Sequence, residues 1–113
     1  MDPQRYLPLT AVVFEILLAL ADGERHGYDV MQDVEQRTGG RIVLHAGTLY
    51  RALSRLLEQG LIEELDERPD RDGDERRRYY RLTTLGRAVA RAEAARLASQ
   101  VSAARRLFRG GRP

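Results

Sequence analysis

A run of thirteen residues near the start of the chain places the strongest constraint on the fold. It extends from Leu9 to Ala21 and is apolar except at Thr10 and Glu15. Such a run is too short to cross a bilayer as a helix, and the acidic Glu15 within it argues against a secretory signal peptide. A helix that is apolar on every side has to be covered on every side. Because so small a chain has few elements to spare, we expect a partner subunit to cover part of it.

The length of 113 residues fits one domain with a single small core. The chain has no cysteine, which excludes disulfides and thiolate metal sites and fits the cytoplasm. The formal net charge of +2 conceals a segregation of charge. Residues 1–75 hold 8 Arg against 16 acidic residues, whereas residues 76–113 hold 11 Arg and only Glu93 as an acid. A basic block of this kind fits a polyanionic partner, and it fits a solvated helix face equally well.

The stretch from residue 45 to residue 62 predicts a helix with one apolar face that ends at Gly60. At about 100° per residue, the residues on the apolar face are Leu49, Ala52, Leu53, Leu56 and Leu57. The residues around the rest of the helix are Gly47, Thr48, Tyr50, Arg51, Ser54, Arg55 and Glu58. Arg can bind guanine through two hydrogen bonds and Ser or Thr can meet several base edges, so this surface fits a DNA major groove. An ordinary solvated helix face has the same character, and this stretch alone leaves both interpretations open.

A further helix is predicted between these two, from about residue 26 to residue 38, with Val30 and Val34 on its inner face. The pair Gly39-Gly40 ends this helix, and a brief extended piece at residues 42–44 leads into the amphipathic helix. The sequence therefore places three helices before residue 61.

Two short strands are predicted after the third helix. Leu61, Glu63 and Leu65 are taken to alternate as in a strand, residues 69–73 are rich in turn formers, and Tyr80 and Leu82 share one face of a returning strand. Three helices followed by a hairpin form a winged helix-turn-helix, whose third helix is the expected reader of DNA. We therefore predict a mainly α fold with a small β-hairpin, in which residues 1–82 form a DNA-binding domain.

A last helix is predicted from Thr83 to residue 109, followed by a loose tail at residues 110–113. Its apolar residues recur at spacings of four and three, as in a coiled-coil seam, and they are Ala90, Ala94, Leu97, Val101, Ala104 and Phe108. The seam can pack within the chain or against a second chain. Because the hairpin separates this helix from the core in sequence, we favour a dimerisation helix.

Four short motifs together resemble the PadR family of bacterial transcriptional regulators. They are HGYDV at 26–30, GTLYRAL at 47–53, LLEQGLIEE at 56–64 and RRRYYRLTTLGR at 76–87. Each motif alone is weak, but four in this order and spacing cover nearly the whole stretch from Leu9 to Phe108 and make a specific signal. The single terminal helix resembles the short-tailed branch of the family.

The resemblance implies a homodimeric repressor that binds a two-fold operator in double-stranded DNA. It implies that Tyr28 helps to seat the DNA-binding unit and that the helix beginning at Gly47 enters the groove. With the arginines of the hairpin, the expected DNA contacts are Tyr28, Gly47, Thr48, Tyr50, Arg51, Ser54, Arg55, Arg76, Arg77 and Arg78. It also implies that the terminal helix packs on the first helix of the partner, which adds Phe14 and Leu17 to the expected dimer interface.

Three features depart from the family pattern. His45-Ala46 stands where the family commonly has Ser-Pro, so a standard helix N-cap is missing. Arg51 stands where many relatives have proline, which puts a cation at the centre of the outward face. The turn of the hairpin, residues 66–75, holds six acidic residues against Arg68 and Arg71. Because phosphate repels an acidic tip, we expect the Arg run at the base of the hairpin, rather than the tip, to contact DNA.

Other classes of function fit the sequence less well. The candidates for chemistry are His26, His45, Tyr28 and Asp29, and they show no metal-ligand spacing and no nucleophile with a base, so we expect neither an enzyme nor a metal or cofactor site. The alternative that stays open is a winged helix that binds protein rather than DNA. The family resemblance also allows a small aromatic or drug-like effector, for which Tyr residues, Phe14 and Phe108 are the aromatic side chains available.

Overall fold

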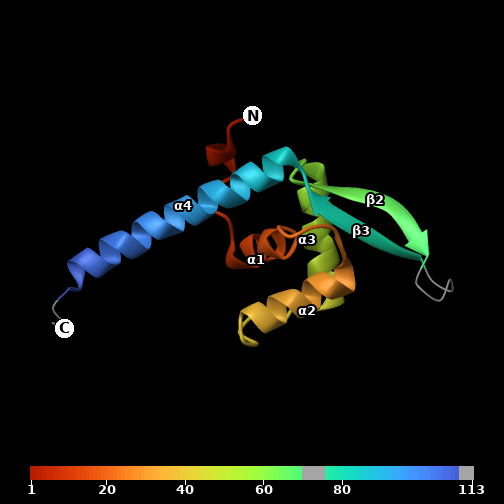
Figure 1. The fold of residues 1–113 in the computed structure, drawn as a ribbon, viewed down its shortest axis with the longest axis horizontal. Coiled ribbons are helices and arrows are strands. Elements are labelled where there is room, and N and C mark those ends of the chain that lie inside the picture. Colours follow the sequence, from red (N-terminus) through yellow and green to blue (C-terminus); the bar gives the residue numbers. More distant parts are fainter. Residues whose placement is uncertain (70–75, 110–113) are drawn as a thin grey trace.

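The computed structural model describes residues 1–69 and 76–109, with side chains described for all of these except residues 66–69 and 76–77. The elements in chain order are η1 Pro3–Tyr6, α1 Ala11–Ala19, β1 Arg25–His26, α2 Gly27–Arg37, α3 Ala46–Glu58, β2 Ile62–Pro69, β3 Arg76–Leu82 and α4 Thr84–Leu107. Figure 1 shows α1, α2 and α3 gathered in one body, with the β2–β3 hairpin extending to one side and α4 extending far to the other. The molecule is accordingly elongated, measuring 59 × 34 × 22 Å.

The helices begin where side chains cap them. Thr10 Oγ1 accepts a hydrogen bond from the amide of Val13 at 3.1 Å, so α1 begins two residues after the predicted start of the apolar run. Thr83 Oγ1 accepts from the amide of Gly86 at 3.0 Å and starts α4. No side chain caps α3 at His45, as the sequence predicts.

The sheet has three strands rather than the predicted two. β3 lies between β1 and β2 and pairs antiparallel with both. The hairpin was predicted, but the two-residue strand β1, Arg25–His26, was not. The extended piece predicted at residues 42–44 connects α2 to α3 and pairs with no strand of the sheet. The predicted turn at residues 70–75 and the predicted tail at residues 110–113 lie outside the described residues.

Of the three residues predicted to alternate, Leu61 is buried, Glu63 is exposed and Leu65 is half-buried. Their neighbours do not continue the alternation, because Ile62 is buried like Leu61 and Glu64 is exposed like Glu63. The reason is that Leu61 precedes the strand and closes the end of α3, where its amide donates to the carbonyl of Leu56 at 3.0 Å. In β3 the prediction is confirmed, because Tyr80 and Leu82 are buried.

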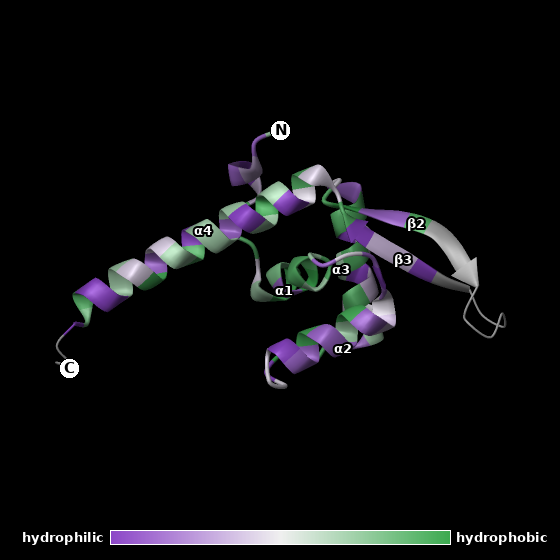
Figure 2. Cartoon of the chain, in the orientation of Figure 1, coloured by the Kyte–Doolittle hydropathy of each residue, from purple (hydrophilic) through white to green (hydrophobic). Residues whose placement is uncertain are grey.

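The apolar face predicted for α3 forms the centre of the core. Leu49, Leu53 and Leu56 are at most 1% exposed. They pack with side chains of every other major element, namely Ile16, Leu17, Leu20, Val30, Val34, Leu61, Ile62, Tyr80 and Val89. Burial of this apolar surface is the main force that fixes α3 and therefore turns its polar face outward. Figure 2 shows α1 as largely hydrophobic along its length, as the sequence predicts.

The first half of α4 belongs to the same core. Val89 is fully buried and Ala90 is 9% exposed. The carbonyl of Leu61 accepts from the amide of Thr83 at 3.1 Å, and a Cβ added at Gly86 would lie 1.8 Å from that carbonyl oxygen. The absence of a side chain at Gly86 thus allows α4 to start directly against the end of α3.

Two residues predicted for the dimer interface are therefore core residues of the single chain. Leu17 is 0% exposed and Ala90 is nearly buried, so neither offers much surface to a partner. The physical reason is that α1 and the start of α4 pack on each other and on α3. This packing buries Ala90, the first residue of the predicted seam, within the single chain.

Candidate nucleic-acid interface

The outward face of α3 carries the predicted DNA-reading residues. Gly47, Thr48, Arg51, Ser54 and Arg55 are all exposed. All of these except Thr48 line one side of an open groove beside α1, whose lining residues are Val13, Gly47, Tyr50, Arg51, Ala52, Ser54, Arg55, Glu58 and Gln59. The structure thus brings two arginines and two hydroxyls to one exposed helix face, where each can donate hydrogen bonds outward.

Tyr50 differs from the other residues of this face. Its side chain is 45% exposed, but a Cβ added at Gly27 would lie 2.5 Å from the Tyr50 phenol oxygen. The ring therefore extends from α3 to the first residue of α2. This contact assigns Tyr50 a role in holding the two helices together, which the sequence pattern alone does not reveal.

The start of α2 is organised around His26. Its Nδ1 accepts from the amide of Asp29 at 3.3 Å, and its Nε2 lies 3.0 Å from Asp29 Oδ2. The ring stacks near Tyr28 and meets Tyr79 edge-on, with centroid distances of 6.4 and 5.5 Å. This geometry suits the tautomer with its proton on Nε2. His26 is thus a helix cap within an aromatic cluster, and Tyr28 lies beside it, 56% exposed.

The hairpin presents arginines that are paired with glutamates. Arg78 Nε lies 3.6 Å from Glu64 Oε1, and Arg81 Nε donates to Glu63 Oε1 at 2.5 Å. Arg76 and Arg77 lie in β3, but their side chains are outside the described residues. Of the three hairpin arginines predicted to contact DNA, Arg78 therefore has a described side chain, and Arg76 and Arg77 stay predictions.

Tyr80 connects the hairpin to α3. Burial raises the pKa of the Tyr80 phenol, and the nearby Glu64 carboxylate and Tyr50 raise this pKa further, while Arg78 opposes them. In the register of the hairpin Glu64 lies directly opposite Tyr80, and Tyr80 is buried in the core that holds Leu49, Leu53 and Leu56 of α3. The hairpin is thus packed on the inner side of α3 through Tyr80.

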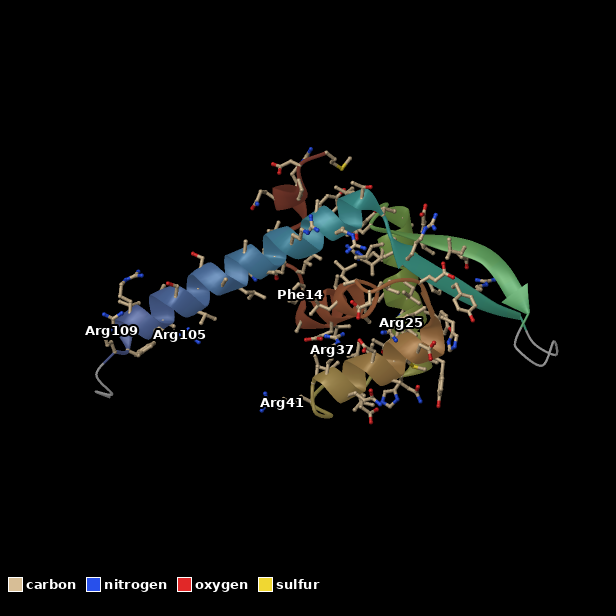
Figure 3. All side chains as sticks on the ribbon, in the orientation of Figure 1. Phe14, Arg25, Arg37, Arg41, Arg105 and Arg109 are labelled. Carbon is tan, nitrogen blue, oxygen red and sulfur yellow. The ribbon has the colours of Figure 1, made fainter. Side chains whose placement is uncertain are left out.

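The second half of α4 is exposed in the single chain. Val101 is 49% and Phe108 73% exposed, Ala94 and Ala104 are exposed, and Leu97 is half-buried. Phe14 on α1 is also half-buried. Figure 3 shows Arg105 and Arg109 near the far end of α4, beyond the body of the molecule. This end of the helix has no cover from the described part of the chain.

Over the described ranges 1–69 and 76–109, no group of three His, Cys, Asp or Glu side chains could hold a metal ion. In the same ranges no helix has the length and the apolar character that a membrane span needs.

Residues 16–92 match the transcriptional regulator PadR-like family. This chain belongs to that family. The match runs from within α1 to within α4 and so includes α2, α3 and the hairpin. The resemblance seen in the four sequence motifs is confirmed. PadR-like proteins are transcriptional regulators, in agreement with the prediction that the chain is not an enzyme.

Two solved structures show the same fold. A PadR family transcription regulator from Clostridium difficile has 23% sequence identity and a TM-score of 0.71, over 89% of this chain and 100% of that chain. Bacillus subtilis PadR, solved in complex with operator DNA, has 22% identity and a TM-score of 0.65, over 75% of this chain and 47% of that chain. The predicted fold class, a mainly α winged helix-turn-helix, is confirmed.

A curated relative is the uncharacterized 37.1 kDa protein in transposon TN4556 of Streptomyces fradiae, 40% identical over 89 residues. The alignment covers 76% of this PadR-like chain, which spans only about a quarter, 24%, of the length of that relative.

The sequence interpretation assigns no role to Glu63, Glu64 or Glu93 in this PadR-like chain. Glu63 lies directly opposite Arg81 in the register of the hairpin, so aligning the two strands would have revealed that pair. Glu93 is the single acid in the basic C-terminal block and is 2% exposed, where it accepts hydrogen bonds from Arg96. An isolated acid among arginines is a signal for such an ion pair.

Proposed function

We propose that this PadR-like protein binds double-stranded DNA as a sequence-specific transcriptional regulator, with α3 in the major groove. The observation that carries the proposal is the orientation of α3. Leu49, Leu53 and Leu56 anchor one side in the core, and Arg51 and Arg55 are exposed on the other side, where they line an open groove beside α1. Arg is the side chain best suited to guanine and to phosphate. Family membership supports the proposal, as does the relative solved with operator DNA.

The same proposal includes a homodimer on a two-fold operator, acting as a repressor. Val101, Leu107 and Phe108 expose apolar surface on α4. A second copy can cover this surface together with Phe14 of α1. A two-fold dimer presents two copies of α3, and these require half-sites separated by about one helical turn or a multiple of it.

A small aromatic or drug-like effector that releases DNA completes the proposal. Its support is the half-buried Phe14 on α1 and the exposed Phe108 at the end of α4, which are available for stacking on a flat molecule. Thermal unfolding in the presence of aromatic compounds tests this part. A compound that raises the melting temperature should also weaken DNA binding.

The decisive experiment is an electrophoretic mobility shift with DNA from upstream of the protein's own gene. We expect retardation at low salt, preference over a scrambled duplex, and loss of the complex at moderate salt because phosphate contacts release counterions. If the folded protein retards neither duplex, the alternative of a winged helix that binds protein is favoured instead.

A further inference from the structure

The hairpin arginines with described side chains are each held by a glutamate of the neighbouring strand. Glu63 and Arg81 are direct partners in the register of β2 and β3, joined by a hydrogen bond of 2.5 Å. Glu64 and Arg78 form a longer pair of 3.6 Å, with side chains 38% and 64% exposed. The positive charge at these two positions is thus compensated within the hairpin itself.

The pair formed by Glu64 and Arg78 lies where it can influence DNA binding. Glu64 lies directly opposite Tyr80 in the register of the hairpin. Tyr80 is buried in the same core as Leu49 and Leu53 of α3, the proposed reading helix. A DNA phosphate that flanks α3 on this side would therefore meet Arg78 together with its acidic partner.

We propose that Glu64 competes with DNA phosphates for Arg78 and thereby limits the affinity of the protein for DNA. The inference rests on the proposed DNA binding. Exposed ion pairs are weak and are screened by salt, so a phosphate can replace Glu64 at Arg78. The Glu64 carboxylate still lies near the phosphate and repels it. Arg78 therefore contributes less to affinity than an unpaired arginine would.

The sequence of the hairpin continues the same pattern beyond these pairs. Residues 66–75 contain six acidic residues and only Arg68 and Arg71 as basic ones. A hairpin that served only to attract phosphate would not carry this excess of acid. Sequence-independent binding to DNA is almost entirely electrostatic. A hairpin with low affinity for phosphate therefore makes stable binding depend on the contacts between α3 and the bases.

A double-mutant cycle on sequence-independent binding tests the inference without knowledge of the operator. Fluorescence anisotropy with a random-sequence duplex is measured over a series of salt concentrations for wild type, Glu64→Gln, Arg78→Gln and the double variant. We expect Glu64→Gln to tighten binding about two- to five-fold and to steepen the slope of log affinity against log salt by up to about 0.9. In the Arg78→Gln background, most of this gain should disappear because there is no arginine to release.

Two matched controls keep the result specific. Glu35→Gln removes an exposed carboxylate from α2, outside the groove of α3, that has no ion-pair partner among the described residues, so it measures the effect of losing negative charge alone. The Glu63→Gln and Arg81→Gln cycle is the second control, because this pair lies on the face of the hairpin opposite Tyr80, and we expect a smaller gain there.

Several outcomes separate this inference from the proposed function. Weaker or unchanged binding by Glu64→Gln overturns the inference alone, and so does an equal gain in the presence and absence of Arg78. If wild-type protein binds no duplex at low salt while its thermal unfolding is cooperative, the proposed function is overturned and the inference with it.

Discussion

The carboxylate of Glu93 in α4 accepts a hydrogen bond from the backbone amide of Leu9 at 3.1 Å, across 84 positions of the sequence. The same carboxylate accepts from Arg96 Nε at 2.6 Å and from Arg96 Nη2 at 2.9 Å. Glu93 is buried, and these donors satisfy the charge that burial would otherwise disfavour. The interaction fastens the segment before α1 to the middle of α4.

The first prediction concerns the stability that Glu93 provides. Hydrogen bonds from Arg96 lower the pKa of Glu93 below its ordinary value of 4.5, the Leu9 amide adds to this effect, and burial opposes it. Glu93→Gln should cost about 1.5 to 3 kcal/mol of unfolding free energy at neutral pH. Because the folded-state pKa is lowered, the stabilisation is present above the ordinary value and is lost as the pH falls through the folded-state pKa.

Urea unfolding of wild type and Glu93→Gln at neutral pH and in acid checks this prediction. The difference in unfolding free energy should shrink as the pH falls. Glu58→Gln is the control, since this exposed side chain has no partner in the described part of the chain. A difference that stays constant into strong acid would show that the charge of Glu93 contributes nothing.

The second prediction concerns the cap of α2. His26→Ala should cost about 0.5 to 2 kcal/mol, since it removes the acceptor of the Asp29 amide. His26→Asn should retain most of the stability, because Asn is among the best N-cap residues. Chemical denaturation compares the two variants. Equal losses would mean that the ring contacts with Tyr28 and Tyr79, and not the cap, determine the role of His26.

Much of the fold could be predicted because it depends on local patterns. The apolar face of α3 repeats with the helical period, and Leu49, Leu53 and Leu56 are buried as that period requires. The hairpin was predicted from a turn-rich segment between strands, and its register brings Tyr80 opposite Glu64. Such signals lie within a few residues of each other, so one sequence suffices to detect them.

The parts that were not predicted depend on contacts between distant residues. β1 has only two residues, Arg25 and His26, and so carries no detectable alternation; it is a strand because β3 pairs with it. The buried Glu93 carboxylate accepts a hydrogen bond from the distant Leu9 amide, and the Tyr50 ring lies against the distant Gly27. The seam of α4 was predicted as one surface, but the packing of Ala90 on the core divides it.

The third prediction compares two helical glycines. Gly86→Ala should destabilise the protein by at least about 3 kcal/mol, because the added Cβ would lie 1.8 Å from the Leu61 carbonyl oxygen and would force α4 away from α3. Gly47→Ala is the matched control. The nearest atom to its added Cβ is the end of the Arg51 side chain at 3.9 Å, so we expect a gain of about 0.5 to 1 kcal/mol. Thermal unfolding that ranks the two variants in the opposite order would contradict the close approach at Gly86.

The fourth prediction concerns the proposed dimer. Val101→Asp places a charge on the exposed apolar surface of α4, and in a packed interface an unpaired charge costs several kcal/mol. The variant should be monomeric or aggregated, whereas Ser102→Asp, one position off the predicted seam, should remain dimeric. Multi-angle light scattering measures both. A well-folded wild-type monomer at micromolar concentration would exclude the dimer and the two-fold operator.

The last prediction separates base reading from phosphate contact. Arg51 projects from the middle of the outward face of α3, whereas Arg78 lies on the hairpin beside that helix. Arg51→Ala should cost about 1 to 3 kcal/mol on the preferred operator and much less on a scrambled duplex, because a bidentate base contact depends on sequence. Arg78→Ala should weaken binding to both duplexes alike and reduce the salt slope by up to about one.

Salt titrations of each variant on operator and scrambled duplexes provide the measurement. For Arg51→Ala the ratio of the two affinities should fall, and for Arg78→Ala it should be preserved, since phosphates are present in every sequence. Arg41→Ala, an exposed arginine after α2 and outside the predicted contacts, serves as the control for loss of positive charge. If Arg51→Ala weakened binding to both duplexes by the same factor, Arg51 would contact DNA without reading its sequence. Base recognition would then have to come from Thr48, Ser54 or Arg55.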